Sequence, residues 1–177
     1  MRRHPSSKGS AEIIVFSVTF LYNRDMKQTL PAFISALEEK GILSPVSLIY
    51  IFGSVAADKA TPMSDIDIAV LFEHLPGGDP AYEEILSEMV LTASEALRLP
   101  EERIDIKALN GSPLFFQYQV ISKNSVIYAR NRREKEFYES SLLSEYLDYN
   151  YYEEIHDRAL QKRLAEGSFG HRPKIVV

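Results

Sequence analysis

The chain has 177 residues, no cysteine and a formal net charge of −5. This length suits one domain with a sizeable core, and the missing cysteines exclude disulfides, thiolate metal sites and cysteine nucleophiles. The acidic balance argues against a general nucleic-acid binder, because such proteins carry a basic surface. No apolar run reaches the roughly 20 residues of a membrane span, and no secretory signal is recognisable. We therefore expect a cytoplasmic protein that binds neither nucleic acid nor membranes directly.

The N-terminal part of the chain predicts an arm, a helix and a buried strand. Residues 13–22 (IIVFSVTFLY) are β-branched and aromatic, which fits either a strand or an extended arm that docks on a partner. Residues 24–40 carry apolar side chains at helical spacing, and Gly41 supplies a stop. Residues 46–52 show no polar alternation, as expected for a strand that is covered on both faces.

The remaining elements follow from the same two periodicities and from the glycine and proline positions. In chain order we expect a short helical turn at 55–59, a strand at 65–72, a turn at 77–80, a helix at 81–97, a strand at 103–109, a helix at 113–120, a short strand or extended link at 125–129, and a long helix at 132–164. The last helix is rich in tyrosine, which indicates either an interface or core packing.

Two aspartates interrupt the apolar strand expected at 65–72. Asp65 and Asp67 stand two residues apart and therefore project to the same side, while Ile66 and Ile68 point into the core. A half-buried pair of carboxylates is costly unless a positive group compensates it. A divalent metal ion, with a phosphate as its companion, is the simplest such group.

The strand at 103–109 repeats the pattern, because Asp105 projects to one side and its two isoleucine neighbours to the other. If the two strands are neighbours, Asp65, Asp67 and Asp105 converge. An oxygen-only set of this kind suits Mg²⁺ or Mn²⁺. Asp105 would then hold a second metal ion or accept the proton of an attacking hydroxyl. The alternative is a surface carboxylate paired with Arg103 or Lys107.

Gly53 and Ser54 follow directly after the strand at 46–52. A glycine at this place lets the backbone approach a ligand, and the following N–H groups and the serine hydroxyl can hold phosphate oxygens. Lys59 could add a point charge to the same phosphate. Ser64 lies near the site by the same logic, but its alternative role is to cap the turn before the next strand.

These residues resemble the signature of a known family. Gly53-Ser54, ten intervening residues and Asp65-Ile66-Asp67 are similar to the motif of the DNA polymerase β-like nucleotidyltransferase superfamily. The run FGS…SDIDIAV resembles its minimal, MNT-type branch. The resemblance implies an α/β (α+β) fold with a small mixed β-sheet flanked by helices and followed by the long C-terminal helix. The expected organisation is an arm at 1–23, the nucleotidyltransferase domain at 24–130, and the C-terminal helix and tail at 131–177.

The resemblance also implies an activity and a partner. Gly53 and Ser54 would hold the triphosphate of ATP, Asp65 and Asp67 the catalytic metal ions, and Asp105 would be the third carboxylate. Many members of this branch are antitoxins paired with a HEPN-domain ribonuclease toxin, and transfer AMP from ATP to a tyrosine of that toxin. The chain lacks the toxin's own pattern, an Arg followed four to six residues later by His. It would therefore be the antitoxin half of such a pair.

One departure from the family pattern keeps other functions open. Relatives usually read Gly-Ser-Arg-Ala-Arg-Gly after the first strand, whereas this chain has Val55 and Ala57 where the arginines would stand. Arginine would stabilise triphosphate charge. A catalytically weak binding module that neutralises the toxin by contact is therefore one alternative. A nucleotidyltransferase with a small-molecule acceptor, such as an aminoglycoside, is another.

Overall fold

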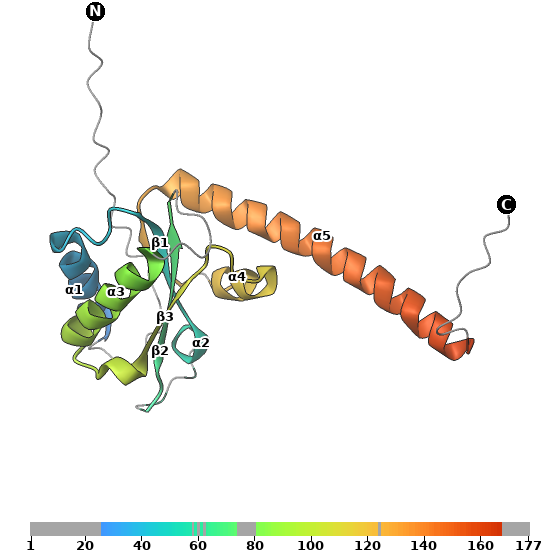
Figure 1. The fold of residues 1–177 in the computed structure, drawn as a ribbon, viewed down its shortest axis with the longest axis horizontal. Helices are drawn as coiled ribbons and strands as arrows, with labels where there is room; N and C mark the ends of the chain where they lie inside the picture. The colour runs from blue at the N-terminus through green and yellow to red at the C-terminus, as the bar shows by residue number, and fades with distance from the viewer. Residues whose placement is uncertain are drawn as a thin grey trace, which may run out of the picture.

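A computed structural model describes residues 26–57, 59, 61, 63–73, 81–123 and 125–167, without the side chains of residues 26–28 and 82. The expected arm and tail at 1–23, the turn at 77–80 and the end of the chain from residue 168 lie outside the described residues. The other expected elements fall within them. Figure 1 shows how these elements are arranged.

Four strands form one mixed sheet in the order β3-β2-β1-β4. They are β1 (Val46–Phe52), β2 (Ile66–Phe72), β3 (Ile104–Ala108) and β4 (Val126–Ala129). The central strand β1 pairs antiparallel with both β2 and β4, whereas β2 pairs parallel with β3. The mixed sheet is therefore confirmed, the segment at 125–129 is a strand, and β3 is an edge strand among the described residues.

Helices cover both faces of this sheet. On one face lie α1 (Met26–Glu39) and α3 (Ala81–Leu97), which pack against each other and against Ile66, Ile68 and Val70 of β2. On the other face lie α4 (Leu114–Ile121) and the first half of α5 (Arg132–Ala165), with Ala69 and Leu71 beneath them. Because side chains alternate along a strand, Asp65 and Asp67 belong to the α4 face.

Element bounds differ from the expected ones by a residue or two. The short helix α2 (Gly53–Ala56) begins directly at Gly53 rather than at residue 55. Asp65 stands just before β2, and Arg103 ends a 3₁₀ turn, η1 (Glu101–Arg103), that leads into β3. Both residues therefore sit where a loop enters the sheet. The Asp65 side chain is exposed there, whereas that of Arg103 is partly buried.

The long helix α5 is docked through its first half only. Asn131 caps its start by accepting a hydrogen bond from the Arg133 N–H at 2.9 Å. The hydroxyl of Tyr50, buried in β1, donates to Glu139 at 3.0 Å, and the Lys135 ammonium donates to the same carboxylate at 2.8 Å. Burial raises the pKa of Tyr50, so its hydroxyl keeps its proton and remains a donor.

A tyrosine pair extends this contact, because the rings of Tyr118 in α4 and Tyr146 in α5 stack with centroids 3.7 Å apart. Beyond Tyr146 the helix projects away from the sheet (Figure 1). The exposed side chains there include Leu147, Tyr149, Tyr151, Tyr152 and Ile155. Core packing is thus the wrong interpretation for the tyrosines of this second half. None of the helices in the described ranges is both long and apolar enough to span a membrane.

Candidate active site

The strand register brings two of the three predicted carboxylates side by side. Asp67 of β2 lies directly opposite Asp105 of β3 in the parallel pairing. Neighbouring strands are about 4.8 Å apart, and side chains in register point to the same face. Asp65 lies two residues before Asp67 and therefore faces the same way. All three predicted aspartates occupy the α4 face, at the end of the sheet where β2 begins.

The electrostatics of Asp67 show that these carboxylates interact. The pKa of Asp67 is raised, first because the side chain is partly buried, then because the negative charge of Asp105 repels a second charge. Asp65 adds to the repulsion, while the Lys107 ammonium opposes it. An added cation would lower the free energy of the ionised cluster, since it would offset this mutual repulsion.

Gly53 fits against Asp67 so closely that no other residue can replace it without movement. Its φ is +67°, a left-handed conformation that glycine adopts without strain. A β-carbon built on Gly53 would lie 2.0 Å from Oδ2 of Asp67. Phe52, the residue before, stands opposite Asp67 in the β1–β2 register. The backbone turn that leads into α2 is therefore in contact with a predicted metal ligand.

Two cations contact the predicted carboxylates, and one of them, Lys107, is a partner that the sequence offered for Asp105 as the alternative to a metal ion. The Lys107 ammonium donates to Oδ2 of Asp105 at 2.5 Å and lies 6.0 Å from the centre of the Phe52 ring. The Arg103 guanidinium lies 3.8 Å from Oδ1 of Asp65 and also donates to the carbonyl of Ser64. The two-residue spacing of Asp105 and Lys107 on one strand was the available signal for the first pair.

The remaining predicted site residues lie around Gly53 and the start of β2. Ser54 is half-buried in α2, and Lys59 is exposed, with its N–H donating to the Ser54 carbonyl at 2.9 Å. The Ser64 hydroxyl accepts a hydrogen bond from the Thr61 N–H at 2.8 Å, and the Ser64 N–H donates back to the Thr61 carbonyl at 2.9 Å. Ser64 therefore caps the turn before β2, which is the alternative role that the sequence offered for it.

The donor set fits a hard divalent cation in its chemistry. The three aspartates offer oxygen ligands only, which Mg²⁺ and Mn²⁺ prefer. Within the described part of the chain, however, no group of three Asp, Glu, His or Cys side chains is already arranged to hold a metal ion. Asp105 and Asp65 are instead turned towards Lys107 and Arg103.

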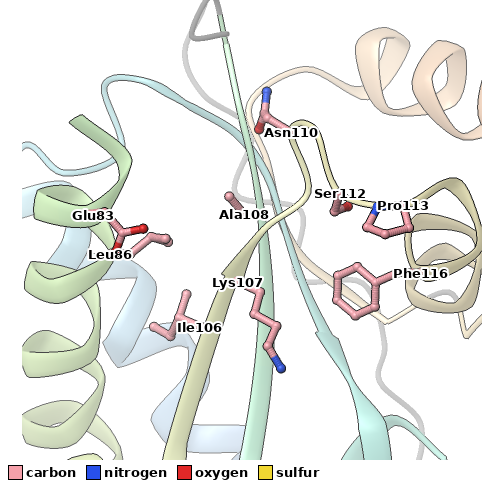
Figure 2. A pocket seen from close by; sticks show the side chains of 9 residues that line it. All are labelled: Glu83, Leu86, Ile106, Lys107, Ala108, Asn110, Ser112, Pro113 and Phe116. Atoms are coloured by element: carbon pink, nitrogen blue, oxygen red, sulfur yellow. The ribbon is translucent and has the colours of Figure 1, made fainter. Parts of the chain in front are cut away.

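A pocket of about 610 Å³ lies beside β3 and adjoins the carboxylates through Lys107. Figure 2 shows that side chains of α3 line one side and the start of α4 lines the other, with β3 between them. The ring of Phe116 on the α4 side also meets the Phe52 ring edge-on, with centroids 5.3 Å apart. The lining residues are Glu83, Leu86, Ile106, Lys107, Ala108, Asn110, Ser112, Pro113 and Phe116.

The fold and this carboxylate face define a nucleotidyltransferase. The family model of the polymerase beta nucleotidyltransferases matches residues 35–133, which is more than half of the chain. The protein therefore belongs to that family. The matched region contains Gly53, Ser54 and all three aspartates, and it ends at the start of α5. No curated protein sequence matches the chain.

Solved structures agree with this fold. The first comparison is a crystal structure of a mutant of the toxin–antitoxin MntA-HpeT, with a TM-score of 0.55 and 20% identity over 74% of this chain and 98% of that chain. The second is a crystal structure of a toxin–antitoxin with AMP-PNP, with a TM-score of 0.54 and 22% identity over 74% and 98% of the two chains. At this level of identity the likeness supports the fold.

Proposed function

We propose that this protein is a Mg²⁺-dependent nucleotidyltransferase that transfers AMP from ATP to a tyrosine hydroxyl of a partner HEPN ribonuclease, and so acts as its antitoxin. Membership of the family supports the reaction class. Structurally similar chains occur in toxin–antitoxins, one of them with AMP-PNP, and this supports the role and the choice of nucleotide. The soluble, cytoplasmic setting expected from the sequence is part of the same proposal.

The proposed reaction exchanges one oxygen for another on the α-phosphorus of ATP. The tyrosine oxygen forms a bond to that phosphorus, the bond to the oxygen bridging to the β-phosphate breaks, and pyrophosphate leaves. Asp105 accepts the hydroxyl proton. Gly53 and Ser54 hold the triphosphate, and Asp65 and Asp67 hold the metal. When bound, the metal supplies charge stabilisation for the attacking and leaving oxygens.

One observation carries the proposal: the Gly53 backbone is pressed against Asp67, which lies opposite Asp105 on the next strand. Asp67 would hold the metal ion and the Gly53 backbone would hold the phosphate, and phosphoryl transfer needs these two groups next to each other. A packing role alone explains neither a left-handed glycine against a carboxylate nor two carboxylates in register. This arrangement therefore favours a transfer site over a structural turn.

The decisive experiment incubates the protein with ATP labelled at the α-phosphate, Mg²⁺ and a candidate HEPN ribonuclease partner. We expect label on a tyrosine of the ribonuclease and loss of ribonuclease activity. Asp67→Asn should abolish labelling, while the exposed carboxylate variant Glu101→Gln should label normally. Labelling that survives Asp67→Asn, or a stable complex that is never labelled, would sink the proposal.

The second candidate function is neutralisation of the toxin by contact alone. Val55 and Ala57 stand where the family pattern has arginines, and Asp105 and Asp65 are already paired with Lys107 and Arg103. Such a site would bind the triphosphate weakly. Cell survival separates the two functions: if Asp67→Asn still protects cells that express the toxin, contact suffices and transfer is not the mechanism.

A further inference from the structure

The edge of β3 that faces away from β2 leaves backbone hydrogen-bonding groups open. The Leu109 N–H donates to the Val70 carbonyl at 2.8 Å, so it points towards β2. Along a strand, the N–H groups of alternate residues point the same way. Asp105 and Lys107 therefore also bond towards β2, whereas the N–H and C=O groups of Ile106 and Ala108 point outwards. No hydrogen bond reported within the described ranges reaches those outward groups.

The pocket lies along this same edge. Ile106, Lys107 and Ala108 all line it, although their side chains alternate between the two faces of the sheet. In Figure 2, Ile106 points towards Leu86 of α3, while Lys107 extends on the side of Phe116. The pocket therefore runs across the strand edge with room on both faces, which is the space that an added strand and its alternating side chains would occupy.

We infer that the outward edge of β3 binds an extended segment of the acceptor protein as an additional strand. Exposed strand edges are templates for such pairing, and proteins usually blunt or cover them. Here the edge instead lies in a pocket, beside a predicted catalytic carboxylate. The pocket walls carry one acid, Glu83, and one base, Lys107. A nucleic acid would need a track of cationic side chains, which this pocket lining does not have.

This inference rests on the proposed function, and it specifies how the acceptor tyrosine would be positioned next to Asp105. Side chains directly opposite each other on adjacent strands have β-carbons about 4.5–5.5 Å apart. A tyrosine placed opposite Asp105 on the added strand would therefore bring its hydroxyl within reach of that carboxylate. Gly53 and Ser54 lie on the far side of β2, on the β1 side. The acceptor oxygen would then attack the α-phosphorus from the side opposite to the one from which pyrophosphate departs.

A backbone-modified peptide tests this edge without knowledge of the partner's sequence. The probe is a blocked peptide of about seven residues, a typical strand length, with a central tyrosine and alternating valine and threonine. Two further versions carry N-methyl groups on alternate residues, one version for each of the two sets. Binding to the full chain is measured by fluorescence anisotropy without ATP, and AMP transfer by mass spectrometry with ATP and Mg²⁺.

We expect one N-methylated set to weaken binding by about tenfold or more, while the other set binds like the parent, because only alternate N–H groups face β3. The amide resonances of Ile106 and Ala108 should shift when the parent peptide binds. Ala108→Pro removes one outward donor and should weaken peptide binding similarly. Its binding of Mg²⁺ and AMP-PNP should stay unchanged, since Ala108 is not one of the residues that would hold either. Its thermal melt shows how much of the fold is retained, because Ala108 also packs against the core.

Four outcomes decide the inference. Equal effects of the two N-methyl sets, or binding that ignores Ala108→Pro, would overturn it. A dimer of the full chain that Ala108→Pro dissociates in the absence of peptide would also overturn it, because a second copy would then be the occupant. Peptide binding with the expected pattern but without AMP transfer would support the edge site and count against the proposed function.

Discussion

The two sides of the carboxylate row are built in opposite ways. On the β1 side, Gly53 touches Asp67 without space for a single β-carbon. On the β3 side, Asp105 stands next to a strand edge and a pocket, and no described residue bonds to the outward groups of Ile106 and Ala108. The backbone on the Gly53 side is therefore fixed in shape, whereas the β3 side can accommodate segments of different shape.

This difference matches the demands of a group-transfer enzyme. The donor of the transferred group is invariant in shape, so a rigid backbone turn can be complementary to it before binding, without an ordering cost. In the proposed function, the acceptor is part of another macromolecule and must enter and leave. A strand edge recognises such a segment through main-chain groups, while the pocket on either face selects side chains. The following predictions test the closed side and the open side separately.

The largest effect is expected from Gly53→Ala on the closed side. The new β-carbon would meet Oδ2 of Asp67 at 2.0 Å, so the carboxylate must move from its place opposite Asp105. Nucleotide binding with Mg²⁺ should become undetectable by calorimetry, and AMP transfer should fall by about 100-fold or more. Stability should fall by about 1–2 kcal/mol from the left-handed backbone alone.

Gly41→Ala provides the matched control for that substitution. Gly41 has a φ of +73°, but no atom outside its neighbours lies within 4 Å of a β-carbon built there. This variant should lose about 1–2 kcal/mol of stability for the same backbone reason and keep full nucleotide binding. If both variants lose binding alike, then strain rather than the contact with Asp67 explains the loss, and the closed side has no special role.

Asp105→Asn is expected to have the next largest effect, and to act on the open side. An amide cannot accept the proton of the attacking hydroxyl, so transfer should fall by about 100- to 10,000-fold. Binding of AMP-PNP with Mg²⁺ should change far less, since Gly53 and Asp67 remain. Calorimetry and single-turnover labelling together measure this split. An equal loss in both would show that Asp105 serves the nucleotide side.

The element types and the faces on which the aspartates lie could be foreseen, because each has a local cause. Alternation placed Ile66 and Ile68 inward and Asp67 outward, and the structure confirms this burial pattern. Sequence could not reveal the contact between Gly53 and Asp67, because it depends on the β1–β2 register and on a positive φ. The open edge of β3 likewise depends on the order of strands in the sheet.

The contact of Arg103 with Asp65 also escaped prediction, for a different reason. Arg103 approaches Asp65 and the Ser64 carbonyl from the 3₁₀ turn before β3, some forty residues away in sequence, and only the parallel pairing of β2 with β3 joins them. The missing arginines at Val55 and Ala57 suggested a shortage of positive charge. The structure instead brings one arginine to this end of the site from the 3₁₀ turn η1.

Arg103→Ala should therefore have an intermediate effect, confined to the entry of β2. Removal of the guanidinium takes one cation from Asp65 and one donor from the Ser64 carbonyl. The pair is partly exposed, so we expect a loss of about three- to tenfold in nucleotide affinity at low salt, and a smaller loss at high salt. Arg158→Ala, which breaks an exposed pair with Glu154 on α5, should change nothing. A loss that is independent of salt would indicate a packing role for Arg103.

The smallest effect on the site is expected from Tyr50→Phe. The Tyr50 hydroxyl donates to Glu139 from a fully buried position between the sheet and α5, and contacts neither side of the carboxylate row. Its loss leaves Glu139 with Lys135 as a partner, so the free energy of unfolding should fall by about 1 kcal/mol. Thermal unfolding measures this fall, and nucleotide binding and AMP transfer should be unaltered.

Tyr149→Phe is the matched control, because its hydroxyl donates to Glu153 at 2.7 Å in the same tyrosine-to-glutamate manner, but on the exposed second half of α5. Water replaces that bond when it is lost, so stability should stay unchanged. If Tyr50→Phe reduced AMP transfer in proportion to stability, the effects of Gly53→Ala and Asp105→Asn could no longer be separated from general loosening of the sheet. An intact activity at lower stability would assign those effects to the two sides of the carboxylate row themselves.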